Sequence, residues 1–161
     1  MAGDRAAFEA LVHSYGKDVL RVCFSVLGDL DAAKDAAQTT WIQAWRRLPK
    51  LQDDTRFRSW LLAVAANEAR QSARSSARRS VRESRIQADH YQSDEVTSID
   101  AVRLETSLAR MRVGDRELLA LRYVAGLTSP EIAALRGISA AGVRGRLSRI
   151  VAQLRKDLVD G

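Results

Sequence analysis

Residues that break helices or form disulfides are scarce in this sequence. Its 161 residues include nine glycines, two prolines and one cysteine. A single cysteine excludes a disulfide framework and a cysteine-ligated zinc site within one chain. Ala, Leu, Arg, Glu and Gln are abundant and favour helices, and no segment shows the alternation typical of a strand. We therefore expect an all-α fold, with Cys23 as a small core residue and a redox role as the weaker alternative.

Long apolar runs and clustered catalytic groups are also missing. No segment reaches the roughly 20 apolar residues of a membrane helix, and the N-terminus has no apolar signal region. The histidines, His13 and His90, are far apart, and there is no glycine-rich phosphate loop. These absences favour a cytoplasmic binding protein over an enzyme. We expect no catalytic residue, no metal, no cofactor and no membrane partner.

What is present is positive charge, almost all of it on arginine. The net charge is +6 and the pI about 10.1. Such a balance indicates nucleic acid, an acidic protein surface or a membrane face as partner. Arginine suits two-pronged contacts to phosphate and guanine better than lysine does.

Apolar spacing predicts three helices in the first half, at about 4–27, 31–48 and from 55 onward. The third helix continues into polar residues at steps of three and four, which share one stripe: Asn67, Arg70, Arg74, Arg78 and Arg82. Taken alone, this stripe fits DNA contact and plain solvation equally well. Trp60 lies near the stripe and could stack on an unpaired base, although packing inside the first domain is the stronger interpretation. We expect Trp41 in the core and Trp45 partly exposed.

The composition changes sharply after the third helix. Residues 86–100 contain acids but no Lys or Arg, which predicts a flexible acidic linker between domains at 1–85 and 101–161. A solvated tether is the favoured interpretation, and masking of the basic faces is the alternative.

The segment from Thr128 to Val151 is the most specific pattern. Thr128 and Glu131 predict a capping box with Pro130 inside it, Gly137 a turn, and Ser139 the cap of a long last helix. We also expect Asp115 to cap the helix before this segment. The arrangement predicts a helix-turn-helix whose last helix enters the DNA major groove. A plain helical hairpin with a solvated basic face is the alternative.

Four segments, in this order, resemble bacterial sigma factors of the extracytoplasmic-function group, over most of the chain. They are residues 7–12, residues 35–45, residues 57–67, and residues 118–147 with their Gly-Leu-Thr and Gly-Ile-Ser turns. The resemblance implies two helical domains, a sigma region 2 bundle and a sigma region 4 helix-turn-helix. It implies core RNA polymerase (its clamp helices and flap) and promoter DNA as partners, a pairing with an anti-sigma protein, and a monomer when free.

The resemblance also assigns roles to residues. Polymerase binding falls on Asp35, Gln38, Thr39, Trp41 and Trp45. Capture of the melted non-template strand at the −10 element falls on Arg56, Arg58, Trp60, Asn67, Arg70, Arg74 and Arg78, and residues 49–56 match the loop that pockets a flipped base. Reading of the −35 element falls on Ser139, Ala140, Ala141, Arg144, Arg146, Ser148 and Arg149.

The sequence departs from the family pattern at several places. Lys34 and Thr39 stand where acids are usual, Gln71 replaces a frequent Asp, and Gly145 replaces a common Ser. They predict a divergent member with its own promoter preference. Two other functions stay open at this point, a stand-alone DNA-binding regulator that dimerises and a sigma-like adaptor that does not touch DNA.

Overall fold

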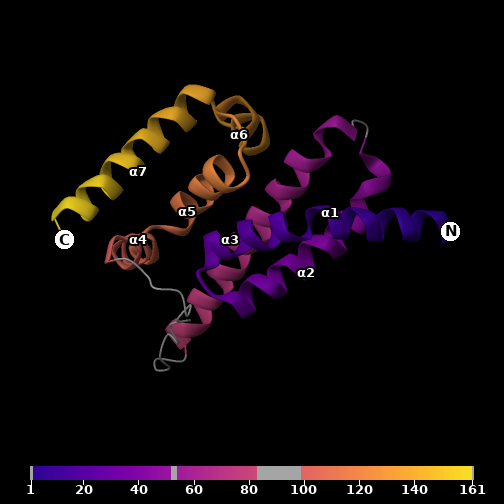
Figure 1. Ribbon diagram of the computed structural model, residues 1–161, viewed down its shortest axis with the longest axis horizontal. Coiled ribbons are helices and arrows are strands. Elements are labelled where there is room, and N and C mark those ends of the chain that lie inside the picture. Colours follow the sequence, from indigo (N-terminus) through magenta and orange to yellow (C-terminus); the bar gives the residue numbers. More distant parts are fainter. Residues whose placement is uncertain (1, 52–53, 83–98, 161) are drawn as a thin grey trace.

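The computed structural model describes residues 2–51, 54–82 and 99–160, and these ranges contain helices and no strand, as the composition predicts (Figure 1). The α-helices are α1 (Ala2–Leu27), α2 (Leu30–Arg47), α3 (Phe57–Arg82), α4 (Ile99–Arg110), α5 (Val113–Leu119), α6 (Ser129–Arg136) and α7 (Ala140–Asp160). Most of the predicted linker lies outside the described residues, and its last two positions belong to α4. None of the described helices is long and apolar enough to span a membrane.

The first three helices pack on one another as a bundle. Gly28 ends α1 with a positive φ of 70°, the left-handed conformation that glycine adopts without a steric cost. Asp29 then accepts a 2.6 Å hydrogen bond from the backbone nitrogen of Ala32 and caps α2. The predicted break at Gly28 is therefore confirmed, and α2 begins one residue before the predicted Asp31 because Asp29 is the cap.

The bundle core consists of small and branched side chains. Cys23 is fully buried, and burial raises the pKa of its thiol to about 12, as expected of a core residue. At the N-terminal end, the ring of Phe8 lies 5.7 Å from that of Trp41 and 4.8 Å from that of Trp45. Trp41 is partly buried, whereas Trp45 is 47% exposed, in line with the expectation for both.

The remaining helices form a second group, which includes the predicted helix-turn-helix. Thr128 accepts a hydrogen bond from the Glu131 nitrogen and donates its own N–H to the Glu131 carboxylate at 2.7 Å, which completes the capping box. Gly137 has a φ of 64°, and Ser139 caps α7 by accepting a 3.0 Å bond from the Gly142 nitrogen. These three local predictions are confirmed.

The prediction for Asp115 is wrong. The N-cap position of α5 is Arg112, whose side chain makes no capping bond, so α5 begins two residues before Asp115. Asp115 lies in the first turn and pairs instead with Arg146 of α7 at 2.8 Å. The carboxylate of Asp115 therefore pairs with an arginine that is distant in sequence, and it does not cap the helix as the local pattern predicts.

The two helical groups pack directly on each other. A π-helical turn, η3 (Ala120–Val124), continues α5 and contacts α1 and α3, and α5 contacts both of these helices as well. Figure 1 shows α5 beside the crossing of α1 and α3, with α6 and α7 beyond it. The buried apolar side chains form one continuous core. The two helical groups therefore share an interface that no local pattern in the sequence predicts.

Candidate nucleic-acid interface

Helix α7 separates an inner apolar face from an outer face of small and basic residues. Val143, Leu147 and Ile150 are buried, at the spacing of one helical stripe. The outer face carries the sequence-predicted reading residues, of which the exposed ones are Ser139, Ala141, Arg144, Ser148 and Arg149. Ala140 is partly buried against the core. The first turns of α7 therefore present short side chains beside a long cation, which allows close approach to a groove.

A shallow groove of about 450 Å³ runs beside this face. Its lining comes from η3, α6 and α7 and includes the arginines Arg122, Arg144 and Arg155. Tyr123 at its edge is 63% exposed. The face of α7 is thus continuous with a positively charged hollow, an arrangement that attracts polyanions.

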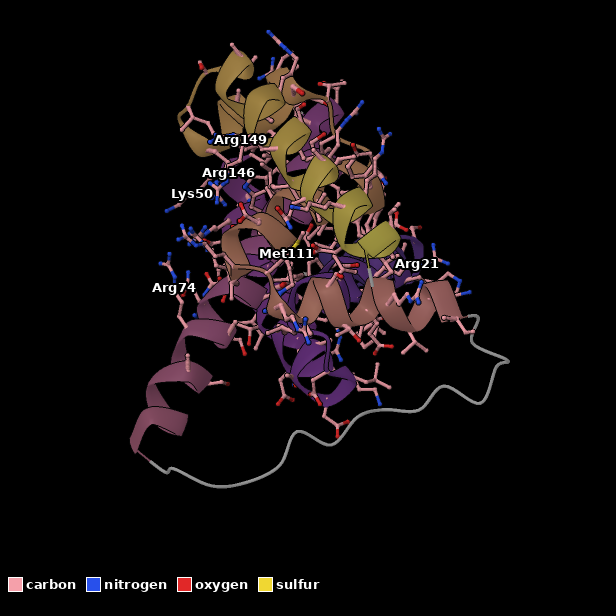
Figure 2. The ribbon with its side chains drawn as sticks, turned by 90° about the vertical axis from the view of Figure 1, so that its left-hand side faces the viewer. Arg21, Lys50, Arg74, Met111, Arg146 and Arg149 are labelled. Carbon is pink, nitrogen blue, oxygen red and sulfur yellow. The ribbon has the colours of Figure 1, made fainter. Side chains whose placement is uncertain are left out.

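Arg146 and Arg149 differ in how far they are free to contact a ligand. Arg146 donates from Nε to Asp115 at 2.8 Å and so ties α7 to α5. Arg149 is exposed, and its Nε reaches the Gly145 carbonyl at 3.4 Å. Figure 2 shows both along the same edge of the molecule as Lys50 and Arg74. Phosphate contact by Arg146 stays a prediction, and it would have to share the guanidinium with Asp115.

The polar stripe of α3 is partly engaged inside the protein. Arg70 donates a 3.0 Å hydrogen bond to the side chain of Asn67, and its Nε lies 3.5 Å from a carboxylate oxygen of Glu117. Arg74 is exposed one turn further along and points away from the body (Figure 2). The side chains of Arg78 and Arg82 lie outside the described residues.

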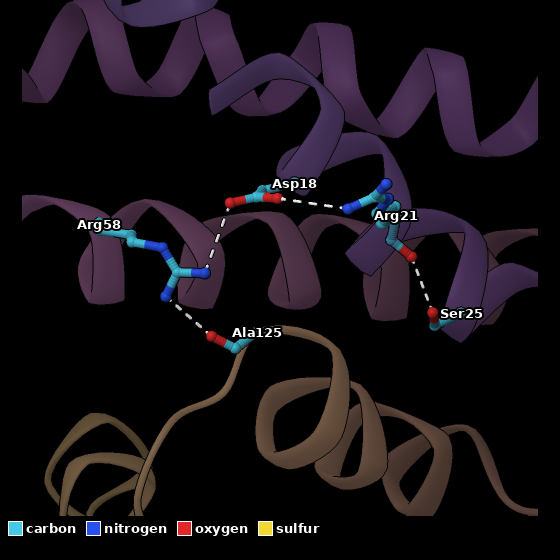
Figure 3. Close-up of polar contacts among 5 residues, drawn as sticks. All are labelled: Asp18, Arg21, Ser25, Arg58 and Ala125. Atoms are coloured by element: carbon cyan, nitrogen blue, oxygen red, sulfur yellow. Dashed lines mark hydrogen bonds and ion pairs between the residues drawn. The ribbon is translucent and has the colours of Figure 1, made fainter. Parts of the chain in front are cut away.

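The start of α3 holds another predicted strand-binding residue in a contact between the two groups. Arg58 donates a 2.8 Å hydrogen bond to the carbonyl of Ala125 and lies 3.4 Å from Asp18 of α1 (Figure 3). Trp60 is half-buried, with its ring 6.0 Å from that of Phe57, so packing inside the first bundle is confirmed for it. Arg56 is exposed at the end of a short 3₁₀ turn, η2 (Asp54–Arg56).

The predicted polymerase-binding residues lie on the outer side of α2. Asp35, Gln38 and Thr39 are exposed, and the Thr39 hydroxyl donates to the Asp35 carbonyl at 3.0 Å. Asp35 and Thr39 line a small polar hollow with Glu68 and Gln71 of α3. The family pattern usually has an acid at the position of Thr39. Glu68 of the neighbouring helix lines the same hollow and so supplies a carboxylate there.

Glu117 is a site residue that the sequence reasoning missed. Its side chain is 2% exposed and forms ion pairs with Arg136 of α6 and Arg70 of α3. It precedes the buried Ala120 and Leu121 by three and four residues, which places it on the inner face of its helix. That spacing is the signal that could have identified a buried acid.

Family comparisons cover both helical groups. The description "Sigma-70 region 2" matches residues 11–79, and "Sigma-70, region 4" matches residues 101–154. The "Probable RNA polymerase sigma-C factor" of Mycobacterium bovis is 30% identical over 91% of this chain and 80% of its own length. The "ECF RNA polymerase sigma factor SigL" of Mycobacterium tuberculosis is 29% identical over 98% of this chain and 92% of its own length.

Two further similarities concern length and fold. The "Probable RNA polymerase sigma factor RfaY" of Xanthomonas campestris is 31% identical over 98% of this chain, which spans only 42% of that protein. The sigma factor RpoE of Bartonella quintana, solved in complex with the anti-sigma factor NepR, has a TM-score of 0.78 and 20% identity, over 94% of this chain and 96% of that one. At that identity the likeness concerns the fold alone.

Proposed function

The chain belongs to the sigma-70 family, in the extracytoplasmic-function group of RNA polymerase sigma factors, and from that premise we propose that it directs core polymerase to promoters with a −10 and a −35 element. The observation that carries the proposal is the capped helix-turn-helix, whose α7 turns Arg144 outward between short side chains. Initiation chemistry belongs to the polymerase, and this chain supplies recognition without catalysing a reaction.

The −35 element is read in duplex form by α7. Ala140 and Ala141 allow the helix into the major groove, where Arg144 reaches a guanine edge or a phosphate. Ser139 and Ser148 flank Arg144, and Arg146 and Arg149 contact the phosphates of the DNA backbone. Because backbone contacts add affinity and base contacts add specificity, Arg144 is the residue on which promoter choice depends most.

The −10 element is captured as a single strand along α3. Asn67, Arg70 and Arg74 follow one helical stripe, which Arg78 extends. Arg56, Arg58 and Trp60 stand at the start of the same helix, next to the loop at 49–56. Guanidinium groups along a helix track a phosphate backbone, and an aromatic ring beside them supports a stacked base.

Core polymerase docks on the outer side of α2. The exposed residues there are Asp35, Gln38, Thr39 and Trp45, with Trp41 behind them. Lys34 is exposed next to Asp35 and makes this surface less acidic. We expect docking that relies more on the apolar edge formed by Trp45 and Ile42, which are 47% and 45% exposed, than on ion pairs.

The proposed organisation has two units, residues 1–85 and 101–161, tethered by residues 86–100. Such a tether lets one polymerase-bound chain contact two separated elements, so each contact needs only modest affinity. The chain acts as a monomer in the cytoplasm. An anti-sigma protein is the third expected partner.

Transcription with purified core polymerase on a library of genomic fragments tests this function. Addition of the chain is expected to produce transcripts from a limited set of start sites that share two upstream elements. Failure to bind core polymerase at low salt would contradict the proposal. Protection of a palindrome by a dimer without polymerase would instead support a stand-alone regulator.

A further inference from the structure

The three arginines proposed to contact DNA from α7 differ in how they are held. Arg144 is exposed, and Arg149 reaches the carbonyl of Gly145 in its own helix at 3.4 Å. Arg146 instead donates from Nε to Asp115 of α5 at 2.8 Å. A side chain that is tied to another helix keeps its direction when α7 meets DNA, whereas a side chain held only by its own helix can turn.

The backbone of α5 constrains the same guanidinium from a second side. A Cβ atom placed on Gly114 would lie 3.2 Å from Nη2 of Arg146, which is a tight contact. Gly114 directly precedes Asp115, so its missing side chain leaves the space next to the carboxylate in which the guanidinium lies. The acid and the helix backbone together define the position of the Arg146 head group.

The ion pair is accessible to a ligand. The side chains of Arg146 and Asp115 are 41% and 22% exposed. A guanidinium has five N–H donors, and the bond to Asp115 uses the one on Nε. The Nη groups therefore stay available, and Arg146 can contact a phosphate without leaving Asp115.

Arg144 and Arg146 lie on opposite flanks of α7. Residues two positions apart in an α-helix are rotated by about 200° around its axis. Arg144 lines the groove beside η3 and α6, whereas Arg146 points to α5. Because phosphate contacts set the register and orientation of a protein on the duplex, a fixed Arg146 on one flank determines which base Arg144 meets on the other.

A fixed Arg146 has two consequences for DNA binding. Its side chain is ordered before DNA arrives, so a complex in the right register does not lose that rotamer freedom again. In other registers the held guanidinium does not follow the phosphates, and the adjacent carboxylate opposes their attraction to it. Both effects favour DNA that carries the matching element over DNA of other sequence.

We propose that Asp115 is a specificity-determining residue, which positions Arg146 so that its phosphate contact forms in the register where Arg144 faces its base. Asp115 does not touch DNA and acts through Arg146, so it is a positioning residue. The inference rests on the proposed function, because it concerns reading of the −35 element by the same helix. It adds that an acid of α5 lowers the affinity of α7 for DNA in general and raises its preference for one sequence.

Binding of the full chain to a duplex of arbitrary sequence tests the effect on charge. In Asp115→Ala the guanidinium of Arg146 is released and engages one more phosphate. We expect tighter binding at low salt, and a plot of log affinity against log salt concentration that is steeper by about 0.9. A slope equal to that of the wild type would overturn the proposal.

Asp157→Ala is the matched control for this measurement. Asp157 lies on the same side of α7 as Arg146, about three turns further along, and accepts a 2.7 Å hydrogen bond from Gln153. The control removes the same charge from the chain at a distance from Arg146, and we expect it to leave the slope unchanged. An equally steep slope for both variants would show that net charge alone is responsible, which would contradict the role of Asp115.

A duplex with the −35 element found by transcription tests the effect on specificity. In Asp115→Ala, the affinity for this duplex relative to the arbitrary duplex is expected to fall by about two- to twelvefold, the factor that ordering one flexible side chain costs. An equal loss of both affinities would show that Asp115 only stabilises the fold. If Asp115→Ala does not fold, Asp115→Asn removes the charge, keeps an acceptor for Arg146 and decides through the salt slope.

Arg146→Gln separates positioning from any other role of Asp115. Without a guanidinium to position, Asp115→Ala in this background should change neither the salt slope nor the ratio of the two affinities. The same effect of Asp115→Ala in both backgrounds would contradict the proposal. Absence of any −35 preference in the wild type would count against the proposed function, whereas the slope on arbitrary DNA judges the tie between Asp115 and Arg146 separately.

Discussion

The guanidinium of Arg58 donates a 2.8 Å hydrogen bond to the carbonyl oxygen of Ala125, 67 residues further along the chain. The same guanidinium lies 3.4 Å from Asp18, which also pairs with Arg21 at 3.9 Å (Figure 3). A single side chain of the proposed strand-binding surface thus caps a helix of the other unit. Because we propose a second role for Arg58 in binding the −10 strand, we expect its removal to affect both the contact with Ala125 and strand capture.

Arg58→Ala is expected to increase the distance between the units of the free chain and to weaken promoter opening by the polymerase complex. The first effect follows from loss of the bond to Ala125, and the second from loss of a cation beside the melted strand. Energy transfer between dyes placed on α1 and α7 measures the first, and single-round transcription measures the second. Arg21→Ala is the control, since Arg21 contacts Asp18 but not Ala125. Unchanged energy transfer or unchanged transcription for Arg58→Ala would argue against the double role.

Arg144→Ala is expected to reduce promoter discrimination. Loss of a bidentate contact to guanine costs about 1–3 kcal/mol at one base pair, or roughly 5- to 150-fold in relative affinity. Competition between −35 variants for the polymerase complex measures this. Arg155→Ala, which removes a charge at the far end of the same groove, should weaken all variants equally. Loss of discrimination by Arg155→Ala instead would place base reading elsewhere on α7.

The capping box predicts a dependence on acid pH. The backbone and side-chain hydrogen bonds of Thr128 lower the pKa of Glu131, with smaller help from Ser59 and Arg58. Because the pKa of Glu131 is lower in the folded state, its carboxylate adds to the free energy of unfolding at pH values above its pKa in the unfolded chain, about 4.3. This stabilisation is lost as pH falls through the pKa of Glu131 in the folded state. Urea unfolding of wild type and Glu131→Gln should therefore differ at pH 7 and converge in acid. A constant difference across this range would contradict the assignment.

Cys23 is expected to resist thiol reagents in the folded protein. Burial raises the pKa of its thiol to about 12, so the reactive thiolate is scarce at pH 8 and the sulfur is shielded. Labelling with a disulfide reagent should be slow in buffer and fast in urea, with the exposed Ser14→Cys as a positive control. The same pKa shift predicts that the free energy of unfolding falls as pH rises above about 8.5, the pKa of the thiol in the unfolded chain. Fast labelling of folded protein would show that the site opens readily.

Local features of the fold could be predicted from the sequence, and contacts between distant residues could not. The breaks at Gly28 and Gly137 and the caps at Thr128 and Ser139 depend on neighbours within a few residues. The same local pattern predicts Asp115 as a cap, but Arg146 lies close to Asp115 in space and pairs with it. The bond from Arg58 to a backbone carbonyl leaves no side-chain pattern at Ala125, so no reading of the sequence could pair them.

The candidate site divides in the same way. The stripe of α3 and the outer face of α7 follow from helical periodicity, whereas the contacts of Arg70 with Glu117 and of Arg58 with the Ala125 carbonyl depend on how the two helical groups pack. A basic stripe alone fits solvation and DNA contact equally well. Buried partners for Arg58 and Arg70 show what balances these charges inside the protein, and their part in strand capture stays a prediction.

Transcription from a single promoter tests the central claim most directly. Core polymerase and the chain are combined on a promoter found with the genomic library, and run-off transcripts are counted for the intact template and for templates with either upstream element scrambled. The account predicts transcripts that depend on the added chain and are lost when either the −10 or the −35 element is scrambled. Equal transcription without the chain, or from both scrambled templates, would contradict it.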